Sequence, residues 1–375
     1  MPPRVVDLRS DTVTEMPAEM RAAMAYAVTG DMLYGNDHNV SQLEENVGEL
    51  FGLTAVWMPS CTMANLVAVI LLNRGAGSEL ILGATSHINV FERKNGTLSG
   101  GMAYKAIPDS GGRIALRDLE GAITEESEFF PMQAGLALEN THNLAGGRTF
   151  HPEYLRRLCQ LARERGLRIH LDGARIFNAS VALDVPLQSW RLNGEGPDSI
   201  ATSLSKGLGT PAGAALMVTH PEDVSRARRI RKALGGTMHT GAGYLAAAAL
   251  VLLRPERYDD LRTQLTRDHD RAKRFANEIR EIAGCTVVAP VETNIVYLTL
   301  DIPASVAVSE LRKQGILCSI LSLDTAGALA VVRDHTPLRF VFHRGILDAD
   351  VVYAVGAINE LMGKCSTLRC SIFSS

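Results

Sequence analysis

Two short stretches decide how this 375-residue chain is interpreted. The first is His170-Leu171-Asp172-Gly173-Ala174-Arg175, and the second is Ser203-Leu204-Ser205-Lys206-Gly207-Leu208-Gly209. Each stretch ends an apolar run of the kind that forms a buried strand. Small and apolar residues surround Lys206, which fits a close-packed turn better than an open surface. The chain therefore places one carboxylate and one amine at the ends of two predicted strands.

This pair of groups suits one cofactor, pyridoxal 5'-phosphate. The cofactor needs a lysine amine for a Schiff base and a carboxylate beside its pyridine nitrogen. The negative charge keeps that nitrogen protonated, so the ring can accept electrons from a neighbouring carbanion. Taken alone, a lysine is usually a solvated surface residue, and an aspartate after a strand often forms a turn or caps a helix. Taken together, Lys206 and Asp172 favour a cofactor site.

The composition narrows the class of protein. Hydrophobic residues make up 46% of the chain, and 38 Lys and Arg residues nearly balance 41 Asp and Glu residues. This balance gives no sign of a nucleic-acid or membrane partner. The six cysteines form no CxxC or zinc-like spacing, which is typical of a reduced, intracellular protein, and we expect no metal. The N-terminal segment has no apolar signal region and the apolar run 242–253 is too short to span a bilayer, so we expect a cytoplasmic protein.

The order of the predicted elements indicates an α/β fold. Strand-like and helix-like stretches alternate between about residues 50 and 250, which predicts a mostly parallel sheet with helices on both faces. The clearest helix is 152–166, where four apolar residues recur at helical spacing. The strand candidates in this part of the chain are 54–58, 79–82, 135–139, 167–171, 199–204 and 214–218.

The chain is long enough for two domains. After Arg254-Pro255 the pattern changes to a long charged helix over about 256–283, followed by a smaller α+β set that includes a strand at 338–342. We therefore predict an N-terminal arm (1–19), a large cofactor-binding domain (20–252) and a small C-terminal domain with a polar tail (253–375).

Several polar residues follow the predicted strands. Ser60-Cys61-Thr62 joins a strand to a helix, and such a helix N-terminus is a natural phosphate site, although the local sequence alone favours an ordinary helix cap. His87 and His142 could stack on a flat ring or transfer a proton near neutral pH, but a single histidine is more often a simple core or surface residue. Open α/β sheets bind ligands at the carboxyl ends of strands, which favours a site here.

Two arginines are candidates for binding a substrate carboxylate. Arg175 follows the Asp172 strand, and Arg339 lies on the apolar strand Leu338 to Phe342. A guanidinium group offers two parallel hydrogen bonds to a carboxylate, although most arginines are simply solvated. The chain contains no HExxH, P-loop or GxSxG motif, and the glycines after Lys206 do not form a dinucleotide fingerprint.

Beyond these groups, a series of motifs over about residues 5–360 resembles the L-threonine aldolases, a branch of the fold-type I pyridoxal-phosphate enzymes. The motifs are Asp7-Leu8-Arg9-Ser10-Asp11-Thr12-Val13-Thr14, Gly30-Asp31-x-x-Tyr34-Gly35, Ser60-x-Thr62-Met63-x-Asn65, Ser86-His87, Glu139-Asn140-Thr141-His142-Asn143, Asp172-Gly173-Ala174-Arg175, Ser203-x-Ser205-Lys206-Gly207-Leu208-Gly209 and Glu292-Thr293-Asn294. The resemblance implies the transferase fold of that class, with a large mostly parallel-sheet domain and a smaller α+β domain.

The resemblance also implies a role for each candidate residue. Lys206 is expected to carry the cofactor, Asp172 to hold its pyridine nitrogen and His87 to stack on its ring. The phosphate is expected at Ser60, Cys61 and Thr62. The substrate carboxylate is expected at Ser10, Arg175 and Arg339, with Arg175 close to the cofactor as well, and the β-hydroxyl is expected at His142. The family is commonly a homotetramer, with a dimer as the alternative, and Tyr34 is expected to reach the site of a neighbouring subunit.

The chain departs from the family pattern at a few positions. Cys61 replaces a glycine in the phosphate turn, and His239 replaces an arginine thought to support the cofactor region. Met32 and Asn36 stand where the family has acidic residues. These changes bear on cofactor affinity and substrate preference more than on the type of reaction.

The reaction that the resemblance implies is retro-aldol cleavage of L-threonine or L-allo-threonine to glycine and an aldehyde. The base that takes the β-hydroxyl proton is His142, His87 or an ordered water molecule, and the sequence does not choose between them. Two alternatives remain: a related lyase or racemase chemistry such as β-elimination, and a non-catalytic relative. A non-catalytic relative would have lost Lys206, Asp172 or Arg339, and all three are present.

Overall fold

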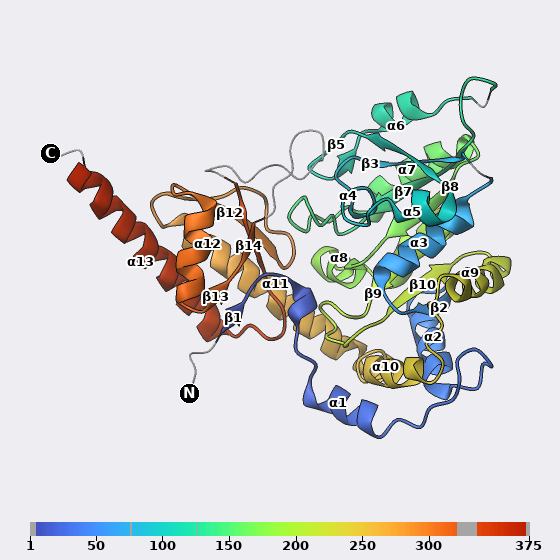
Figure 1. Ribbon diagram of the computed structural model, residues 1–375, viewed down its shortest axis with the longest axis horizontal. Coiled ribbons are helices and arrows are strands. Elements are labelled where there is room, and N and C mark those ends of the chain that lie inside the picture. Colours follow the sequence, from blue (N-terminus) through green and yellow to red (C-terminus); the bar gives the residue numbers. More distant parts are fainter. Residues whose placement is uncertain (1–4, 76, 126, 321–335, 373–375) are drawn as a thin grey trace. The chain divides into compact units, whose positions relative to one another are not determined.

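A computed structural model of the chain describes residues 5–75, 77–125, 127–320 and 336–372, with side chains only up to residue 364 in the last helix (Figure 1). The chain divides into two compact units. The larger unit comprises Glu15–Leu144 and Thr149–Arg262, and the smaller comprises Met1–Thr14, Ala145–Arg148 and Thr263–Ser375. Cys365 and Cys370 carry side chains outside the described part.

The larger unit is built on a seven-stranded sheet with the order β2-β10-β9-β8-β7-β3-β4. Only β10 runs antiparallel to its neighbours, so the predicted mostly parallel sheet is confirmed. All six strand candidates are present, and the edge strand β4 is an additional one. The strands are β2 (Thr54–Met58), β3 (Glu79–Gly83), β4 (Ala103–Ile107), β7 (Gln133–Glu139), β8 (Arg168–Asp172), β9 (Ser199–Ser203) and β10 (Ala214–Val218).

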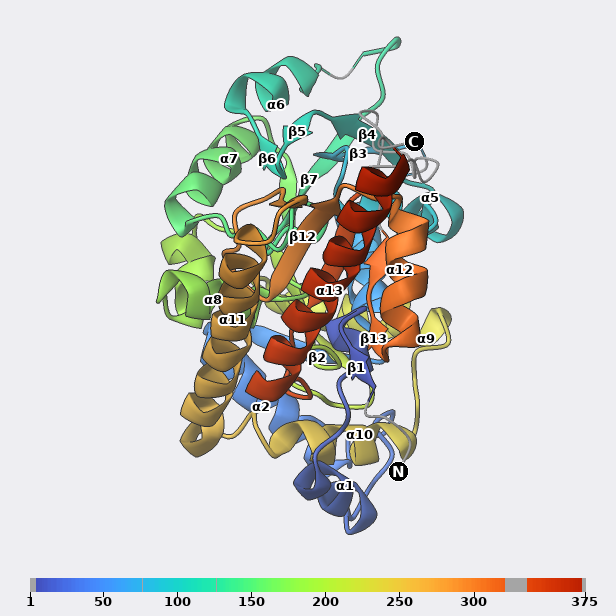
Figure 2. The same cartoon turned by 90° about the vertical axis from the view of Figure 1, so that its left-hand side faces the viewer.

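The central strands are apolar runs because helices cover both of their faces. Val56 and Met58 of β2 belong to the apolar cluster with α3 and α9, while Ala55 and Trp57, on the opposite face of the strand, are also buried. Figure 2 shows α5 and α9 on one side of this sheet and α7 and α8 on the other. The helices of this unit are α1 (Ala18–Ala25), α2 (His38–Phe51), α3 (Cys61–Leu72), α4 (His87–Val90), α5 (Asn95–Gly100), α6 (Leu116–Ala122), α7 (Pro152–Glu164), α8 (Ile176–Leu183), α9 (Pro221–Ala233) and α10 (Gly241–Leu250), with 3-10 helices at Leu187–Gly194 and Pro255–Arg257.

Helix α7 illustrates how the sequence sets the local structure. Pro152 occupies the first turn, where its missing N–H group costs nothing. The predicted apolar residues Leu155, Leu158, Cys159 and Ala162 are all buried. The helix stops two residues before Gly166, which adopts a left-handed φ of 70° and lets the chain turn directly into β8. The parallel pair of β7 and β8 with α7 between them brings their carboxyl ends to the same edge.

The smaller unit contains an antiparallel sheet with the order β11-β12-β15-β14. Its apolar core combines these strands with one face of each of three long helices. A short strand near the N-terminus, β1 (Val6–Asp7), pairs in parallel with β13 (Ile316–Leu317). The remaining elements are the 3-10 helix Asp11–Val13, α11 (Tyr258–Arg280), β11 (Cys285–Val287), β12 (Ile295–Leu300), α12 (Ala304–Lys313), β14 (Ser319–Ile320), β15 (Leu338–Val341) and α13 (Asp348–Ile372). In the larger unit, the hairpin strands β5 (Asp109–Ser110) and β6 (Arg113–Ile114) complete the set.

The two units differ from the predicted division in three places, the first being that Ala145–Arg148 belongs to the smaller unit. Residues 1–14 of the predicted arm belong to the smaller unit, because β1 pairs with β13 and the Leu8 carbonyl accepts a hydrogen bond from the Val341 N–H group. The boundary falls at Arg262, inside α11, and not near residue 252, because α11 is one continuous helix from Tyr258. Among the described residues, no helix is both long and apolar enough to cross a bilayer.

The smaller unit buries an ionisable group on α11. Asp268 is 1% exposed, its Oδ1 accepts a hydrogen bond from Gln264 Nε2 at 3.0 Å, and Arg271 lies 4.0 Å away. Its Oδ2 has no hydrogen-bond partner among the described residues. Burial raises the pKa of Asp268 to about 7, although the neighbouring arginines act in the opposite direction. The protonated carboxyl group is therefore the form that the fold favours.

We expect Asp268→Asn to stabilise the protein above neutral pH. The raised pKa means that the contribution of Asp268 to stability is complete below its unfolded value of 3.8 and is lost as the pH rises through about 7. The neutral amide removes this loss, which amounts to at most about 4 kcal/mol for a shift of this size. Thermal unfolding of both proteins between pH 4 and pH 8 measures it, with the exposed Asp270→Asn as the control. A difference in melting temperature that does not grow with pH would contradict the prediction.

Candidate active site

The candidate residues of the larger unit gather at one edge of its sheet. Strands β2, β3, β7, β8 and β9 all run in the same direction, because β2 and β9 are both antiparallel to β10. The chain segments that leave their carboxyl ends therefore meet at that edge. These segments carry, in strand order, Ser60, His87, His142, Asp172 and Lys206.

Asp172 is the last residue of β8 and is 1% exposed. Its Oδ1 accepts a hydrogen bond from the Ala174 N–H group at 3.1 Å, and its Oδ2 accepts one from Asn65 Nδ2 at 2.9 Å. Lys206 is half-buried in the turn after β9, where its carbonyl accepts a hydrogen bond from the Gly209 N–H group at 2.9 Å. The two strands are parallel neighbours in the sheet, so Asp172 and the turn that carries Lys206 lie at the same edge.

Several charged side chains act on the Cys61 thiol and shift its pKa. Burial raises the pKa of Cys61 well above its ordinary value, and the negative charge of Asp172 raises it further. The positive charges of Lys206 and Arg175 act in the opposite direction. All three charges therefore lie within electrostatic reach of the Cys61 thiol at the start of α3. Arg175 is 5% exposed and donates a hydrogen bond from Nη1 to Asn143 Oδ1 at 3.1 Å.

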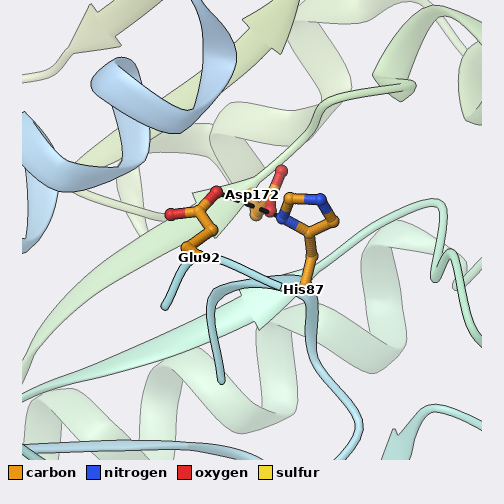
Figure 3. Close-up of side chains that lie close together, drawn as sticks. All are labelled: His87, Glu92 and Asp172. Atoms are coloured by element: carbon orange, nitrogen blue, oxygen red, sulfur yellow. Dashed lines mark hydrogen bonds and ion pairs between the residues drawn. The ribbon is translucent and has the colours of Figure 1, made fainter. Parts of the chain in front are cut away.

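His87 faces two buried carboxylates (Figure 3). Its Nδ1 lies 3.1 Å from Glu92 Oε1, and one polar atom from each of His87, Glu92 and Asp172 lies within 4.8 Å of the others. Burial by itself lowers the pKa of His87, but the hydrogen bond to Glu92 and the charges of Asp172 and Glu139 outweigh it, so the pKa is raised. Burial raises the pKa of Glu92, against the opposing effect of His87.

Such a set of three side chains can in principle ligate a metal ion. Here, however, the amide nitrogen of Asn65 donates hydrogen bonds to both Glu92 and Asp172, at 2.8 and 2.9 Å. The two carboxylates thus face a neutral N–H donor, which is the geometry of a hydrogen-bond network. A metal site would instead direct these oxygen atoms at one cation.

His142 is enclosed beneath a hairpin. The Gly111-Gly112 turn between β5 and β6 has positive φ at both residues, 57° and 79°, which suits a tight two-residue hairpin. Gly112 is also required by space, because a Cβ atom there would lie 2.5 Å from the imidazole ring of His142. The ring is 2% exposed, with Nε2 at 3.4 Å from Asp109 Oδ2 and 3.7 Å from Glu139 Oε2.

The charges around His142 raise its affinity for a proton. Burial by itself lowers the pKa of His142, but the charge of Glu139, the bond to Asp109 and the charge of Asp172 outweigh it and raise the pKa. Glu139 also links the two histidines, because its Oε2 accepts a hydrogen bond from the His87 N–H group at 2.7 Å. Asp109 is fixed in turn by hydrogen bonds from the Thr85 N–H and hydroxyl groups, at 3.1 and 2.7 Å.

The predicted phosphate turn has the geometry of a helix start. Ser60 caps α3, with its Oγ accepting a hydrogen bond from the Met63 N–H group at 3.2 Å. Cys61 is the first residue of α3 and has a helical backbone, so a side chain in place of glycine causes no strain here. Thr62 is exposed beside it. The first N–H groups of a helix have no partner within the helix, so this turn can bind an anion.

The other predicted residues belong to other parts of the chain. Ser10 and Arg339 belong to the smaller unit, where Arg339 is 5% exposed and its Nη1 donates a hydrogen bond to the Arg9 carbonyl at 3.1 Å. Ser10 accepts hydrogen bonds from the Thr12 N–H and hydroxyl groups. In the larger unit Tyr34 is 80% exposed on a turn.

Four residues at the site had no role in the sequence interpretation: Asn65, Glu92, Asp109 and His170. Asn65 stood inside a recognised motif, and His170 inside the quoted Asp172 stretch, but neither position by itself indicates a contact. Asp109 follows β4, a strand that was missed, so the rule that ligands gather at strand ends could have found it. Glu92 lies five residues after His87 and carried no signal beyond its charge.

The fold and the site define a pyridoxal-phosphate-dependent lyase of fold type I. The site fits the cofactor because a buried carboxylate, a half-buried lysine and a helix start with free N–H capacity meet at one sheet edge. The beta-eliminating lyase family matches residues 7–303. The low-specificity L-threonine aldolase 1 of Arabidopsis thaliana is 36% identical over 364 residues, which cover 96% of this chain and 97% of that protein.

Other similar proteins support the same family. The low specificity L-threonine aldolase of Escherichia coli K12 is 37% identical over 311 residues, covering 82% of this chain and 89% of that protein. A threonine aldolase structure from Leishmania major superimposes with a TM-score of 0.81 at 18% identity, covering 95% of this chain and 99% of that one. The Sphingomonas wittichii serine palmitoyltransferase shares the fold, with a TM-score of 0.71 at 17% identity, over 97% of this chain and 88% of that one. The chain belongs to the threonine aldolase branch of the beta-eliminating lyase family.

We expect Asp109→Asn to lower the pKa of His142. The amide removes the charge nearest to Nε2 but leaves Glu139 and Asp172, so the pKa should fall without returning to that of a buried, isolated imidazole. Titration of the histidine ring signals by NMR measures the change, with Asp109→Glu as the variant that keeps the charge. If His142 titrates identically in the wild type and in Asp109→Asn, the ion pair does not control its protonation.

Proposed function

We propose that this protein cleaves L-threonine, L-allo-threonine and related β-hydroxy-α-amino acids to glycine and an aldehyde. The observation that carries the proposal is the convergence of Lys206, Asp172 and His87 at one sheet edge, in a chain similar over 96% of its length to a low-specificity L-threonine aldolase. The reaction breaks the Cα–Cβ bond of the substrate. The β-hydroxyl loses its proton, the β-carbon leaves as the carbonyl carbon of the aldehyde, and the α-carbon gains a proton to give glycine.

Each site residue has a defined task in this proposal. Pyridoxal phosphate, when bound, supplies an electron sink for the charge that develops at the α-carbon. Lys206 holds the cofactor through its amine, and the negative charge of Asp172 keeps a proton on the pyridine nitrogen. The flat ring of His87 would stack on the ring of the cofactor. Ser60, Cys61 and Thr62 hold the phosphate at the start of α3.

Proton transfer from the β-hydroxyl requires a base near neutral pH. His87 and His142 both have a raised pKa, so a larger fraction of each is protonated at pH 7 than for an ordinary histidine. Only the neutral imidazole can accept the proton, so activity should increase as the pH rises through the pKa of the base. His142 is buried beside the β5–β6 hairpin, and an ordered water molecule is the third candidate acceptor.

Binding of the amino-acid carboxylate is the proposed task of Arg175, Arg339 and Ser10. Guanidinium groups hold a carboxylate through two parallel hydrogen bonds. Fixing the carboxylate also fixes which bond at the α-carbon is aligned for cleavage, and this alignment is a large part of the rate enhancement.

We further propose that the protein is a cytoplasmic homo-oligomer, a tetramer or a dimer, in which Tyr34 reaches a neighbouring site. The support is a set of exposed apolar side chains just after α1, on the segment before α2 and near the start of α10, and these three helices pack together in the larger unit. They are Tyr26, Val28, Leu33, Tyr34, Met238 and Tyr244. An exposed apolar patch of this kind marks a protein interface. The described cysteines 61, 159, 285 and 318 are all free, in keeping with a reducing compartment.

The first test concerns the attachment of the cofactor. Borohydride reduction of the loaded protein followed by peptide mapping should place the pyridoxyl group on Lys206, because this half-buried residue follows the strand next to that of Asp172. Lys232, on α9 of the same unit, serves as the internal control and should remain unlabelled. A label on any other lysine would overturn the site assignment.

Arg339→Ala should retain bound cofactor and its visible absorbance, yet lose most of kcat/KM with L-threonine. Loss of a charged hydrogen bond costs roughly ten- to more than a hundred-fold, and loss of orientation adds to that. Steady-state kinetics beside an absorbance spectrum separate the two effects. Unchanged kinetics would exclude Arg339 from carboxylate binding.

The family description also covers β-elimination, which is the second candidate reaction. L-Threonine then yields 2-oxobutanoate and ammonium instead of glycine and acetaldehyde. Product analysis with L-threonine, L-allo-threonine and phenylserine decides between the two reactions. Glycine in amounts equal to the aldehyde supports the proposed function, whereas 2-oxobutanoate as the main product refutes it.

A further inference from the structure

Asn65 lies at the centre of a buried hydrogen-bond network to which the proposed mechanism assigns no role. It is on α3, 1% exposed, and its single Nδ2 donates to Asp172 Oδ2 at 2.9 Å and to Glu92 Oε1 at 2.8 Å. The Asn65 amide therefore bridges the carboxylate that faces the cofactor and the carboxylate that faces His87.

The contact of the Asn65 oxygen atom with His170 fixes the orientation of the amide. Carboxylates only accept hydrogen bonds, so the nitrogen of Asn65 must face them and its oxygen must face His170, whose Nε2 lies 3.0 Å away. Burial lowers the pKa of His170 to about 4, so the ring is neutral, and its one proton must be on Nε2. The other ring nitrogen then accepts a hydrogen bond from the Ser199 hydroxyl at 2.9 Å.

We propose that Asn65 is a positioning residue, which holds the Asp172 and Glu92 carboxylates as a separated pair and fixes the Asp172 oxygen atoms for the pyridine nitrogen of the cofactor. His170 and Ser199 support this role by allowing only one orientation of the amide. The inference rests on the proposed cofactor site, but it does not depend on which amino acid the enzyme cleaves.

The physical argument is the cost of two like charges close together. Glu92 and Asp172 are almost fully buried, and the charge of Asp172 disfavours ionisation of Glu92. Two N–H bonds from one amide stabilise both anions at once. Without them, one carboxylate must take up a proton, and this is Glu92, whose pKa burial already raises. His87 then loses the charge of its hydrogen-bond partner, and Asp172 loses the bond that orients it.

The test compares Asn65→Leu, which has a similar shape but no donors, with Asn46→Leu. Asn46 is a matched control: it is 6% exposed on α2 of the same unit, and its Nδ2 donates to the Leu253 carbonyl instead of a carboxylate. Titrating each apo-protein with pyridoxal phosphate gives the dissociation constant. We expect Asn65→Leu to weaken binding roughly ten- to a hundred-fold, the range for loss of a hydrogen bond to a charged group. Asn46→Leu should change it less than about two-fold.

A second measurement needs neither cofactor nor substrate. NMR titration of the histidine ring signals in the apo-protein should show a lower pKa for His87 in Asn65→Leu than in the wild type, with Asp172 and Glu139 as its remaining acidic neighbours. Asn65→Asp has the same size and can still accept a hydrogen bond from His170. It should also weaken cofactor binding, and it replaces Asn65→Leu in the test if that variant does not fold.

The orientation is tested at His170. His170→Gln keeps a donor for the Asn65 oxygen and should bind the cofactor like the wild type, whereas His170→Leu should bind it more weakly. Equal dissociation constants for Asn65→Leu, Asn46→Leu and the wild type, or an unchanged pKa of His87, overturn the inference. If wild type fails to release glycine from L-threonine while Asn65→Leu still loses cofactor affinity, the proposed function fails and the role of Asn65 stands.

Discussion

The buried negative charge of Asp172 is the constraint on which the rest of the site depends. A carboxylate that is 1% exposed is tolerated only with donors or opposite charges around it; Asn65 and the Ala174 N–H group donate to Asp172, and Lys206 is on the turn after the neighbouring strand. These partners come from three different elements, so the charge fixes how α3, β8 and the turn after β9 meet. The parallel strands make this possible, because they deliver every one of these segments to one edge of the sheet.

The large-scale fold could be predicted because long, regular patterns of apolar residues specify its strands and helices. Apolar runs bounded by turns identified all six strand candidates, and helical spacing identified α7. The misses are short or depend on distant partners: β1 is two residues long and exists through pairing with β13, more than 300 positions along the chain, and β4 is a partly exposed edge strand. The unit boundary was displaced because a continuous helix, α11, carries no composition signal at the point where its packing partners change.

The site was predictable to the extent that its residues stand in recognisable motifs. Lys206 and Asp172 follow from the needs of the cofactor, and the structure brings both to one edge of the sheet. Glu92 and Asp109 could not be found in this way, since their importance is a contact with His87 or His142 that only the folded sheet creates. The amide of Asn65 makes the same point: its position was quoted, yet its function lies in the direction of two N–H bonds, which no sequence pattern specifies.

In the structure, two of the residues that depart from the family pattern contact the same residue, Asp31. His239, where the family has arginine, has its Nδ1 at 2.9 Å from Asp31 Oδ2, and this hydrogen bond lowers the pKa of Asp31. Asn36, where the family has an acidic residue, instead accepts a hydrogen bond from the Asp31 N–H group at 2.6 Å. The cationic position and the acidic positions of the family pattern are thus both absent here, and His239 contacts Asp31 instead. Because the absent charges have opposite sign, they partly offset one another, and the Asp31–His239 contact gives the turn that carries Tyr34 a polar anchor at its base.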